Sequence, residues 1–137
     1  MTLAIRRLRA GDAELVEKLA CREPQTALLD DPRTLFLVAL EGDEPVGFVL
    51  AYELPRRHGH ALTLCIYEVD VAAASRRRGV ATRLMRELEA IARESGIAEA
   101  FVLTDPDNVA AMELYRSVGG IPQAVVQWDL EYEEGSG

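Results

Sequence analysis

Apolar residues along the chain recur with two different periods, and these predict the order of strands and helices. Alternating or continuous apolar runs predict strands at residues 2–8, 34–41, 45–54, 61–71, 98–104 and 121–132. Helical spacing of apolar residues predicts helices that begin at Asp12, span residues 79–96 and span residues 108–118. A short additional helix is expected around residues 25–29.

This order predicts an α/β fold with a mixed sheet. Residues 42–44, Gly-Asp-Glu, join two of the strands as a hairpin, so the first half of the sheet is expected to be antiparallel. The strand–helix–strand unit that follows adds a crossover, and helices are expected on both faces. The 137 residues are expected to form a single domain over residues 1–132, followed by a frayed tail at residues 133–137.

Charge and composition narrow the choice of partner. Fifteen Lys and Arg residues stand against 23 Asp and Glu residues, so the net charge at pH 7 is −8. This acidic balance argues against nucleic-acid binding and favours a cationic partner. No apolar run reaches the length of about 18 residues that a membrane span needs, and no signal peptide is predicted, so a cytoplasmic location is expected.

Two cysteines are present, and no Cys/His cluster has the spacing of metal ligands. No metal is therefore expected. Cys21 and Cys65 both lie among apolar neighbours, so they are expected to be buried, reduced thiols. In particular, Cys65 is expected to pack in the core rather than to accept an acyl group, because no histidine lies near it in the sequence.

The most informative segment connects a buried strand to a long helix. The strand ends at Val71, three arginines occupy residues 76–78, and the helix begins at Gly79. The first amides of a helix have no intrahelical partner and lie at the positive end of the helix dipole. Because Gly79 and Ala81 are small, an anion can approach the backbone closely. The pattern therefore predicts a pyrophosphate cradle rather than a solvated basic turn.

The spacing Arg76-x-x-Gly79-x-Ala81 resembles the acetyl-CoA signature of the GNAT superfamily of N-acetyltransferases. A second block has the spacing of the late helix of that family: Asn108, Ala111, Leu114, Tyr115 and Gly119. The resemblance covers residues 65–120. It implies a mixed, mostly antiparallel sheet of about six or seven strands with helices on both faces. It also implies acetyl-CoA as co-substrate and is compatible with a homodimer.

Two shorter segments carry a closer resemblance. Residues 66–69, Ile-Tyr-Glu-Val, and residues 76–82, Arg-Arg-Arg-Gly-Val-Ala-Thr, are similar to the aminoglycoside 3-N-acetyltransferase branch. This implies acetyl transfer to the 3-amino group of an aminoglycoside, a cationic small molecule, and hence antibiotic resistance. Glu68 stands where that branch usually has aspartate. The alternatives are a polyamine or a peptide or protein amine as acceptor, or a non-catalytic acyl-CoA-binding module.

Direct transfer of acetyl from a thioester to an amine needs a base for the amine and an acid for the leaving thiolate. Positions 66, 68 and 70 are expected to share one strand face. Glu68 and Asp70 are therefore both candidate catalytic bases. The branch resemblance favours Glu68, directly or through water, and Asp70 is expected to attract the ammonium group. Tyr115 matches the family tyrosine whose hydroxyl lies near the cofactor sulfur, so it is the expected acid.

The resemblance implies cofactor contacts at the strand end, the loop and the late helix: Val69, Val71, Arg76, Arg77, Arg78, Gly79, Val80, Ala81, Thr82 and Asn108. The Val71 amide is a candidate donor to the oxyanion, and Asn108 is equally a candidate helix N-cap. Asp105 and Asp107 follow the carboxyl end of a strand, where open α/β sheets place ligands, so they are expected in an acidic acceptor pocket. Phe101, Trp128 and Tyr132 are expected in the core or at its rim.

Overall fold

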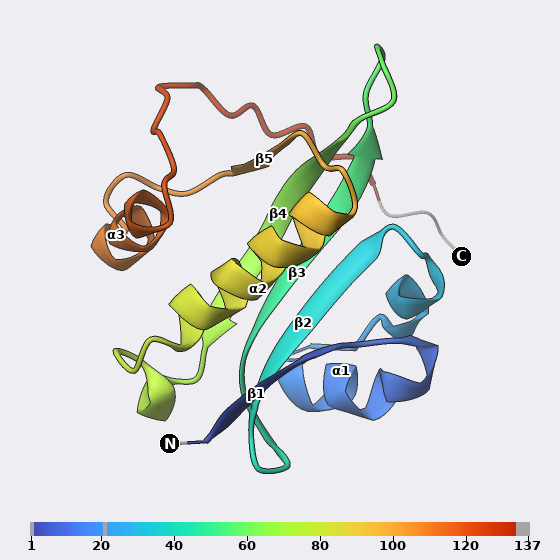
Figure 1. The fold of residues 1–137 in the computed structure, drawn as a ribbon, viewed down its shortest axis with the longest axis vertical. Helices are drawn as coiled ribbons and strands as arrows, with labels where there is room; N and C mark the ends of the chain where they lie inside the picture. The colour runs from blue at the N-terminus through green and yellow to red at the C-terminus, as the bar shows by residue number, and fades with distance from the viewer. Residues whose placement is uncertain (1, 21, 134–137) are drawn as a thin grey trace.

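The computed structural model describes residues 2–20 and 22–133, in which five strands form one mixed sheet. The strands lie in the order β1 (Leu3–Arg7), β2 (Thr34–Glu41), β3 (Glu44–Pro55), β4 (Leu62–Val71) and β5 (Glu99–Val102) (Figure 1). Successive strands from β1 to β4 are antiparallel, and β5 pairs with β4 in parallel. The predicted fold class is confirmed, with fewer paired strands than expected.

Helices cover both faces of the sheet, as predicted. On one face lie α1 (Ala13–Leu19) and the 3-10 helix η2 (Thr26–Asp30), and on the other lie α2 (Val80–Glu94) and α3 (Val109–Ser117). Two short 3-10 turns, η1 (Ala10–Asp12) and η3 (Ala73–Ser75), precede α1 and α2. None of the helices in residues 2–20 and 22–133 has the length and apolar character to span a membrane.

The core consists of two apolar layers, one on each face of the sheet. On the α2 face, Leu35 and Leu37 pack with Leu84 and Leu88, and all four side chains are almost fully buried. The layer on the α1 face is built from Phe36, Val38, Leu50, Val16 and Leu29. β2 is buried on both faces along almost its whole length, so it joins the two layers into one core.

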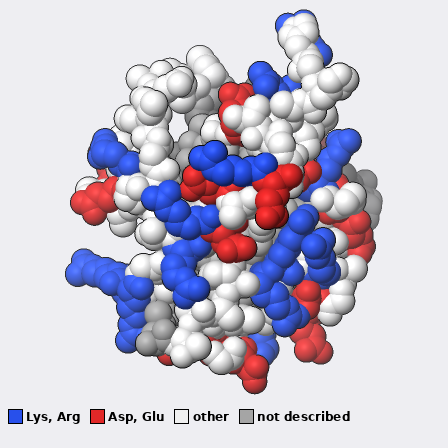
Figure 2. Space-filling view, in the orientation of Figure 1, with Lys and Arg blue, Asp and Glu red and all other residues white. Residues whose placement is uncertain are grey.

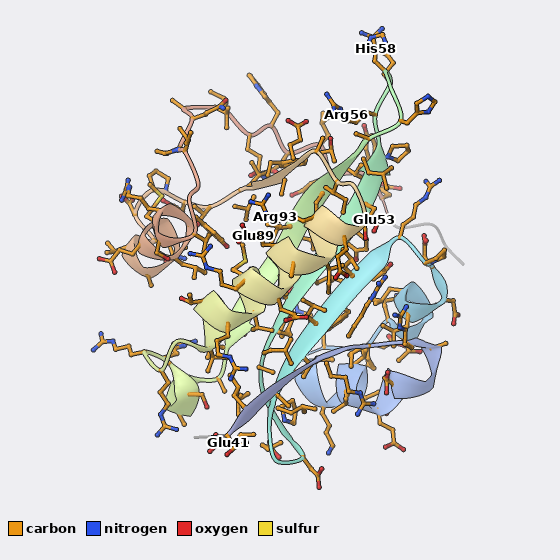
Figure 3. The ribbon with its side chains drawn as sticks, viewed as in Figure 1. Glu41, Glu53, Arg56, His58, Glu89 and Arg93 are labelled. Atoms are coloured by element: carbon orange, nitrogen blue, oxygen red, sulfur yellow. The ribbon has the colours of Figure 1, made fainter. Side chains whose placement is uncertain are left out.

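Helix α2 is amphipathic, which explains its position across the sheet. Val80, Leu84, Met85 and Leu88 are buried at helical spacing. On its outer face, Glu89 accepts from Arg93 at 3.0 Å and from Arg86 at 3.0 Å, and Figure 3 labels Glu89 and Arg93 on this helix.

The last predicted strand, residues 121–132, does not form in the structure. This segment has no assigned strand, and its apolar side chains are exposed. Trp128 and Tyr132 are each 84% exposed, so the expectation that they lie in the core or at its rim is wrong for these two residues. Phe101 is 44% exposed and lies outside the buried core. An amphipathic strand needs both a partner edge and a surface for its apolar face, and the segment meets neither within residues 2–20 and 22–133. Cys21 and tail residues 134–137 lie outside the described residues.

Candidate active site

An open cleft lies where β4 and β5 separate. The two strands pair only from Thr63↔Glu99 to Ile66↔Val102, after which β4 continues to Val71 while the other chain turns away. The cleft has a volume of about 350 Å³. Its lining residues are Tyr67, Glu68, Val69, Asp70, Val102, Leu103, Thr104, Asn108, Ala111 and Tyr115. Among the described strands, the β5-facing edge of β4 beyond Ile66 has no partner.

A β-bulge in β4 sets which side chains face which side. Ala51 pairs with Ile66 and Leu50 pairs with Glu68, so Tyr67 is an extra residue in β4. Ile66 therefore belongs to the α2 face, whereas Glu68 lies opposite Leu50 on the α1 face. The expectation that positions 66, 68 and 70 share one face is wrong, because the bulge reverses the alternation after Ile66.

Tyr67 is a lining residue that the sequence analysis did not single out. The bulge brings its ring to the same face as Tyr52, with the ring centroids 5.9 Å apart and the planes at 70°. Tyr67 and Glu68, which are neighbours in the sequence, are both exposed and both line the cleft. The sequence does contain a signal for the bulge. The apolar residues of this strand have even numbers at Leu64 and Ile66 but odd numbers at Val69 and Val71, so the alternation shifts by one residue between them.

The two predicted carboxylates play different structural parts. Asp70 Oδ1 accepts from the Val71 N–H at 3.0 Å and lies 4.0 Å from Arg76 Nη2. Arg76 Nε in turn donates to the Val71 carbonyl at 3.1 Å. Asp70 and Arg76 thereby brace the end of β4, and the Val71 amide is engaged by its own neighbour. Glu68 is exposed in the cleft, where a substrate or a water molecule can reach it.

Tyr115 reaches the cleft from α3 and packs against the α2-side core. Burial raises the pKa of its phenol, so the hydroxyl remains protonated well above neutral pH. A tight turn holds the end of the helix, with the Gly120 N–H donating to the Tyr115 carbonyl at 2.8 Å. A Cβ on Gly120 would lie 2.8 Å from that carbonyl oxygen, so this turn requires glycine.

The polar residues before α3 shape its first turn. Asn108 is the N-cap: its Oδ1 accepts from the Ala111 N–H at 3.1 Å, and the residue also lines the cleft. Asp105 Oδ1 accepts from the Asp107 N–H at 2.8 Å. Asp105 and Asp107 are not among the residues that line the cleft, so the structure does not bring them together with Glu68.

The arginine-containing loop leads from β4 into α2. Arg77 and Gly79 both have left-handed backbone conformations, with φ of 64° and 77°. Gly79 is the N-cap of α2, and no atom lies within 4 Å of the position that a Cβ would occupy. Successive turns of this kind direct backbone N–H groups toward a bound anion. Val80 points into the core, whereas Ala81 and Thr82 lie on the first turn.

Other titratable groups offer weaker chemistry. Cys65 is only partly buried, on the face that carries Tyr52, and burial raises the pKa of its thiol, which disfavours the thiolate. His58 and His60 are exposed at the tip of the β3–β4 hairpin, where Figure 3 labels His58 beyond Arg56. Neither histidine lines the cleft.

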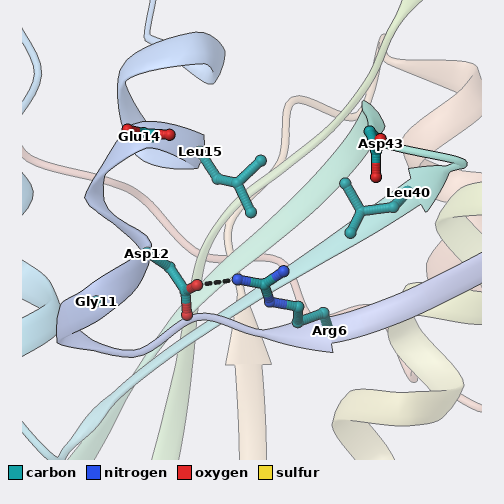
Figure 4. Close-up of a pocket in the computed structure, with 7 residues that line it drawn as sticks. All are labelled: Arg6, Gly11, Asp12, Glu14, Leu15, Leu40 and Asp43. Atoms are coloured by element: carbon teal, nitrogen blue, oxygen red, sulfur yellow. Dashed lines mark hydrogen bonds and ion pairs between the residues drawn. The ribbon is translucent and has the colours of Figure 1, made fainter.

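A second cavity, of about 210 Å³, lies beside the start of α1 (Figure 4). Two of its charged groups are paired with each other, because the Arg6 guanidinium donates to Asp12 Oδ1, and the Arg9 N–H donates to Asp12 Oδ2 at 2.8 Å. These bonds lower the pKa of Asp12, with the backbone bond from Arg9 as the largest cause. The cavity therefore serves the local structure of the chain.

Comparison with known proteins agrees with this geometry. Residues 3–119 match the model of the acetyltransferase (GNAT) family. An L-2,4-diaminobutyric acid acetyltransferase from Streptomyces avermitilis is 34% identical over 92 residues, which are 66% of this chain and 50% of that protein. The corresponding enzyme from Shouchella clausii is 36% identical over 84 residues, 60% of this chain and 44% of that protein. The matched part of this chain thus spans half or less of the length of these curated relatives.

Solved structures share the whole architecture. An aminoglycoside acetyltransferase from an uncultured soil metagenomic sample superposes with a TM-score of 0.90 at 29% identity, over 97% of this chain and 100% of the other. A second aminoglycoside acetyltransferase from such a sample, solved with sisomicin, gives a TM-score of 0.85 at 23% identity, over 96% and 97% of the chains. At that identity the second likeness concerns the fold alone.

Proposed function

The chain belongs to the GNAT acetyltransferase family, and we propose that it transfers the acetyl group of acetyl-CoA directly to an amine bound in the β4–β5 cleft. The observation that carries this proposal is the meeting of an exposed carboxylate, Glu68, and a protonated phenol, Tyr115, in one cleft beside an unpaired strand edge. These are a base and an acid on either side of a site for an extended ligand.

The described residues fit the two ends of acetyl-CoA. Pantetheine carries amide groups, and the unpaired edge of β4 beyond Ile66 presents the backbone N–H and C=O groups that amides need. The pyrophosphate fits the first turn of α2, where residues 76–82 provide arginine side chains, open space at Gly79 and amides at a helix N-terminus. Asn108 and Val69 line the same cleft.

The proposed reaction needs one bond formed and one broken. Glu68 accepts a proton from the ammonium form of the acceptor, directly or through water, and the free amine then attacks the thioester carbon. The C–N bond forms and the C–S bond breaks, and the Tyr115 hydroxyl donates its proton to the departing thiolate. The amide nitrogen then gives its excess proton back to the Tyr115 phenolate, directly or through water, which leaves the neutral amide and restores the phenol. The raised pKa of Tyr115 suits this order, because the phenol stays protonated until a strongly basic group appears beside it.

The acceptor is proposed to be a polycationic small molecule, with the 3-amino group of an aminoglycoside as the specific case. The net charge of −8 and the exposed carboxylates of Glu68 and Asp70 favour a cationic ligand. Similarity to an aminoglycoside acetyltransferase supports the class, whereas the choice of the 3-amino group rests on the sequence resemblance alone. Asp105 and Asp107 remain proposed acceptor contacts, and a cytoplasmic location remains a prediction.

A second candidate acceptor is L-2,4-diaminobutyric acid, because the curated relatives are acetyltransferases of that compound. It differs from an aminoglycoside by its carboxylate, which the acidic side chains at the cleft would repel. Charge therefore favours the aminoglycoside, and sequence similarity favours the diamine.

A thiol-release assay with acetyl-CoA distinguishes these candidates. The panel is gentamicin, spermidine, L-2,4-diaminobutyrate and a short lysine peptide. We expect release with gentamicin, and NMR of the product is expected to show acetylation at the 3-amino group. Release with the diamine or peptide alone would reassign the acceptor. Tight binding of acetyl-CoA without transfer to any amine would instead identify an acyl-CoA-binding module.

A further inference from the structure

Gly47 lies in the interior of the sheet, where β3 passes beside the start of α2. It pairs with Ala39 of β2 and with Val71 of β4, so a strand lies on each side of it. A glycine weakens the interior of a strand, and it is typical of places where another part of the protein approaches the backbone closely. The atoms around Gly47 show what approaches it here.

Three neighbouring atoms leave too little room for a side chain at Gly47. A Cβ at this position would lie 3.1 Å from the Asp70 carbonyl oxygen, 3.1 Å from Val80 Cγ1 and 3.3 Å from Val71 Cγ2. Carbon atoms pack best at about 3.5–4.0 Å, so both carbon contacts would be too short. A methyl group on Gly47 would therefore push its neighbours away.

Val80 is the neighbour that would have to move. It is the first residue of α2, and it is almost fully buried. A β-branched side chain in a helix has one strongly preferred rotamer, so the position of Cγ1 is tied to the helix backbone. The Asp70 carbonyl, in contrast, belongs to β4, which is paired with β3 at this point. A methyl group on Gly47 would thus displace the first turn of α2 rather than the sheet.

This first turn carries the amides that face a bound anion. Gly79, the N-cap, directly precedes Val80, and the first N–H groups of a helix have no partner within it. Figure 2 shows Lys and Arg side chains, in blue, gathered at the lower left, over the loop that leads into α2 in Figure 1. One turn later the helix is anchored, because Arg83 Nη1 donates to the Leu3 carbonyl at 3.1 Å and Leu84 is fully buried. Movement at Val80 would therefore change the anion site more than the rest of the helix.

We propose that Gly47 is a positioning residue for the cofactor. Because it has no side chain, Val80 packs directly against the backbone of β3, and this contact places the first turn of α2 where the pyrophosphate of acetyl-CoA needs it. Gly47 does not line the cleft, so its effect must pass through Val80. The inference rests on the proposed function, since it requires the pyrophosphate to bind at this turn. The effect should be confined to ligands that carry the pyrophosphate.

Gly47→Ala tests this role with two acetyl donors. S-acetyl-pantetheine has the thioester and the amides of acetyl-CoA but lacks the pyrophosphate. We expect Gly47→Ala to raise the Kd for CoA in calorimetric titration by about 10-fold, the loss of about one hydrogen bond to a charged group. The KM for acetyl-CoA should rise similarly at nearly constant kcat, whereas kcat/KM for S-acetyl-pantetheine should keep the parent value. Gly11→Ala is the matched control, because a Cβ on Gly11 meets no atom within 4 Å, and it should leave all these constants unchanged.

A second substitution shows whether the effect passes through Val80. Val80→Ala removes Cγ1 and makes room for the methyl group, but it also leaves a small cavity, so Val80→Ala alone is the baseline. In the double variant Gly47→Ala/Val80→Ala, the Kd for CoA should return to within about 2-fold of that baseline. Val80→Ile presses on the same contact from the helix and should weaken CoA binding as Gly47→Ala does. If Gly47→Ala alone does not fold, the double variant and Val80→Ile carry the test.

Three results would overturn the inference. The first is a folded Gly47→Ala variant, or a folded Val80→Ile variant, that binds CoA as tightly as the parent. The second is an equal loss with S-acetyl-pantetheine, which would place the effect at the cleft, through the Asp70 carbonyl. The third is a double variant in which the two losses simply add, which would mean that the contact with Val80 is not responsible. All three leave the proposed function standing, whereas a parent protein that binds no CoA would contradict the proposed function and the inference together.

Discussion

At the scale of single residues, Tyr115 combines two properties that an acid needs. It is held in place by the turn at Gly120, and its partial burial keeps the phenol protonated. The sign of the effect is clear: because the pKa is raised from 10.0, the proton that Tyr115 donates remains available throughout the neutral and moderately alkaline range. Loss of the acid form should therefore appear only above the ordinary tyrosine range.

We expect Tyr115→Phe to lower kcat by about 10²-fold or more while changing the KM for acetyl-CoA little, because removal of the hydroxyl leaves packing intact. Steady-state kinetics with acetyl-CoA as the varied substrate makes this separation. The matched control is Tyr67→Phe, which removes a hydroxyl from the same cleft and should retain turnover. If Tyr67→Phe were the more damaging change, the acid would be assigned to the wrong tyrosine.

Glu68 is the residue on which the proposed proton transfer from the amine depends. Glu68→Gln preserves size and removes basicity, so kcat at neutral pH should fall by about 10²–10⁴-fold, the usual span for general-base catalysis. Glu113→Gln, on the exposed surface of α3, is the control. Full activity of Glu68→Gln would remove this residue from the mechanism.

At the scale of elements, most of the fold could be predicted because its signals are local. Apolar periodicity and the glycines at positions 79 and 96 predicted α2 closely, and the hairpin of β2 and β3 followed from the turn at residues 42–44. The bulge was not predicted, although the apolar alternation shifts by one residue between Ile66 and Val69. Which residues join the cleft depends on that one extra residue, so the site was predicted less well than the fold.

The segment of residues 121–132 marks a different limit of prediction from sequence. Alternation over residues 121–132 predicts a strand, but a strand is completed by its partner, and none of the described strands pairs with this segment. Local pattern predicts that a face must be covered without specifying what covers it. For Asp105 and Asp107, the position after β5 was predicted correctly, but backbone capping before α3 engages the Asp105 carboxylate.

The start of α2 offers a prediction that separates backbone conformation from charge. Gly79 has a left-handed backbone, which asparagine and aspartate tolerate better than other residues, and open space surrounds its Cβ position. Gly79→Asn should therefore have a moderate effect. Gly79→Asp has nearly the same shape but adds a negative charge, so it should weaken acetyl-CoA binding at least about 10-fold more than Gly79→Asn does. Calorimetric titration of both variants measures the difference, and equal affinities would place the pyrophosphate elsewhere.

At the scale of the whole molecule, the net charge of −8 attracts any cation, so local recognition must be separated from the general field. Asp70 allows this, because Asp70→Asn keeps an oxygen that can accept from the Val71 N–H and removes only the charge. Asp43, at the β2–β3 turn and outside the cleft, provides the control, since Asp43→Asn changes the net charge equally.

We expect Asp70→Asn to raise the KM for gentamicin several-fold at low ionic strength. The difference from the parent should shrink at high salt, where the screening length falls to about 3 Å at 1 M. Asp43→Asn should leave that KM nearly unchanged at both ionic strengths. Equal effects of the two variants would mean that the acceptor responds to the overall field of the protein and not to the carboxylate beside the cleft.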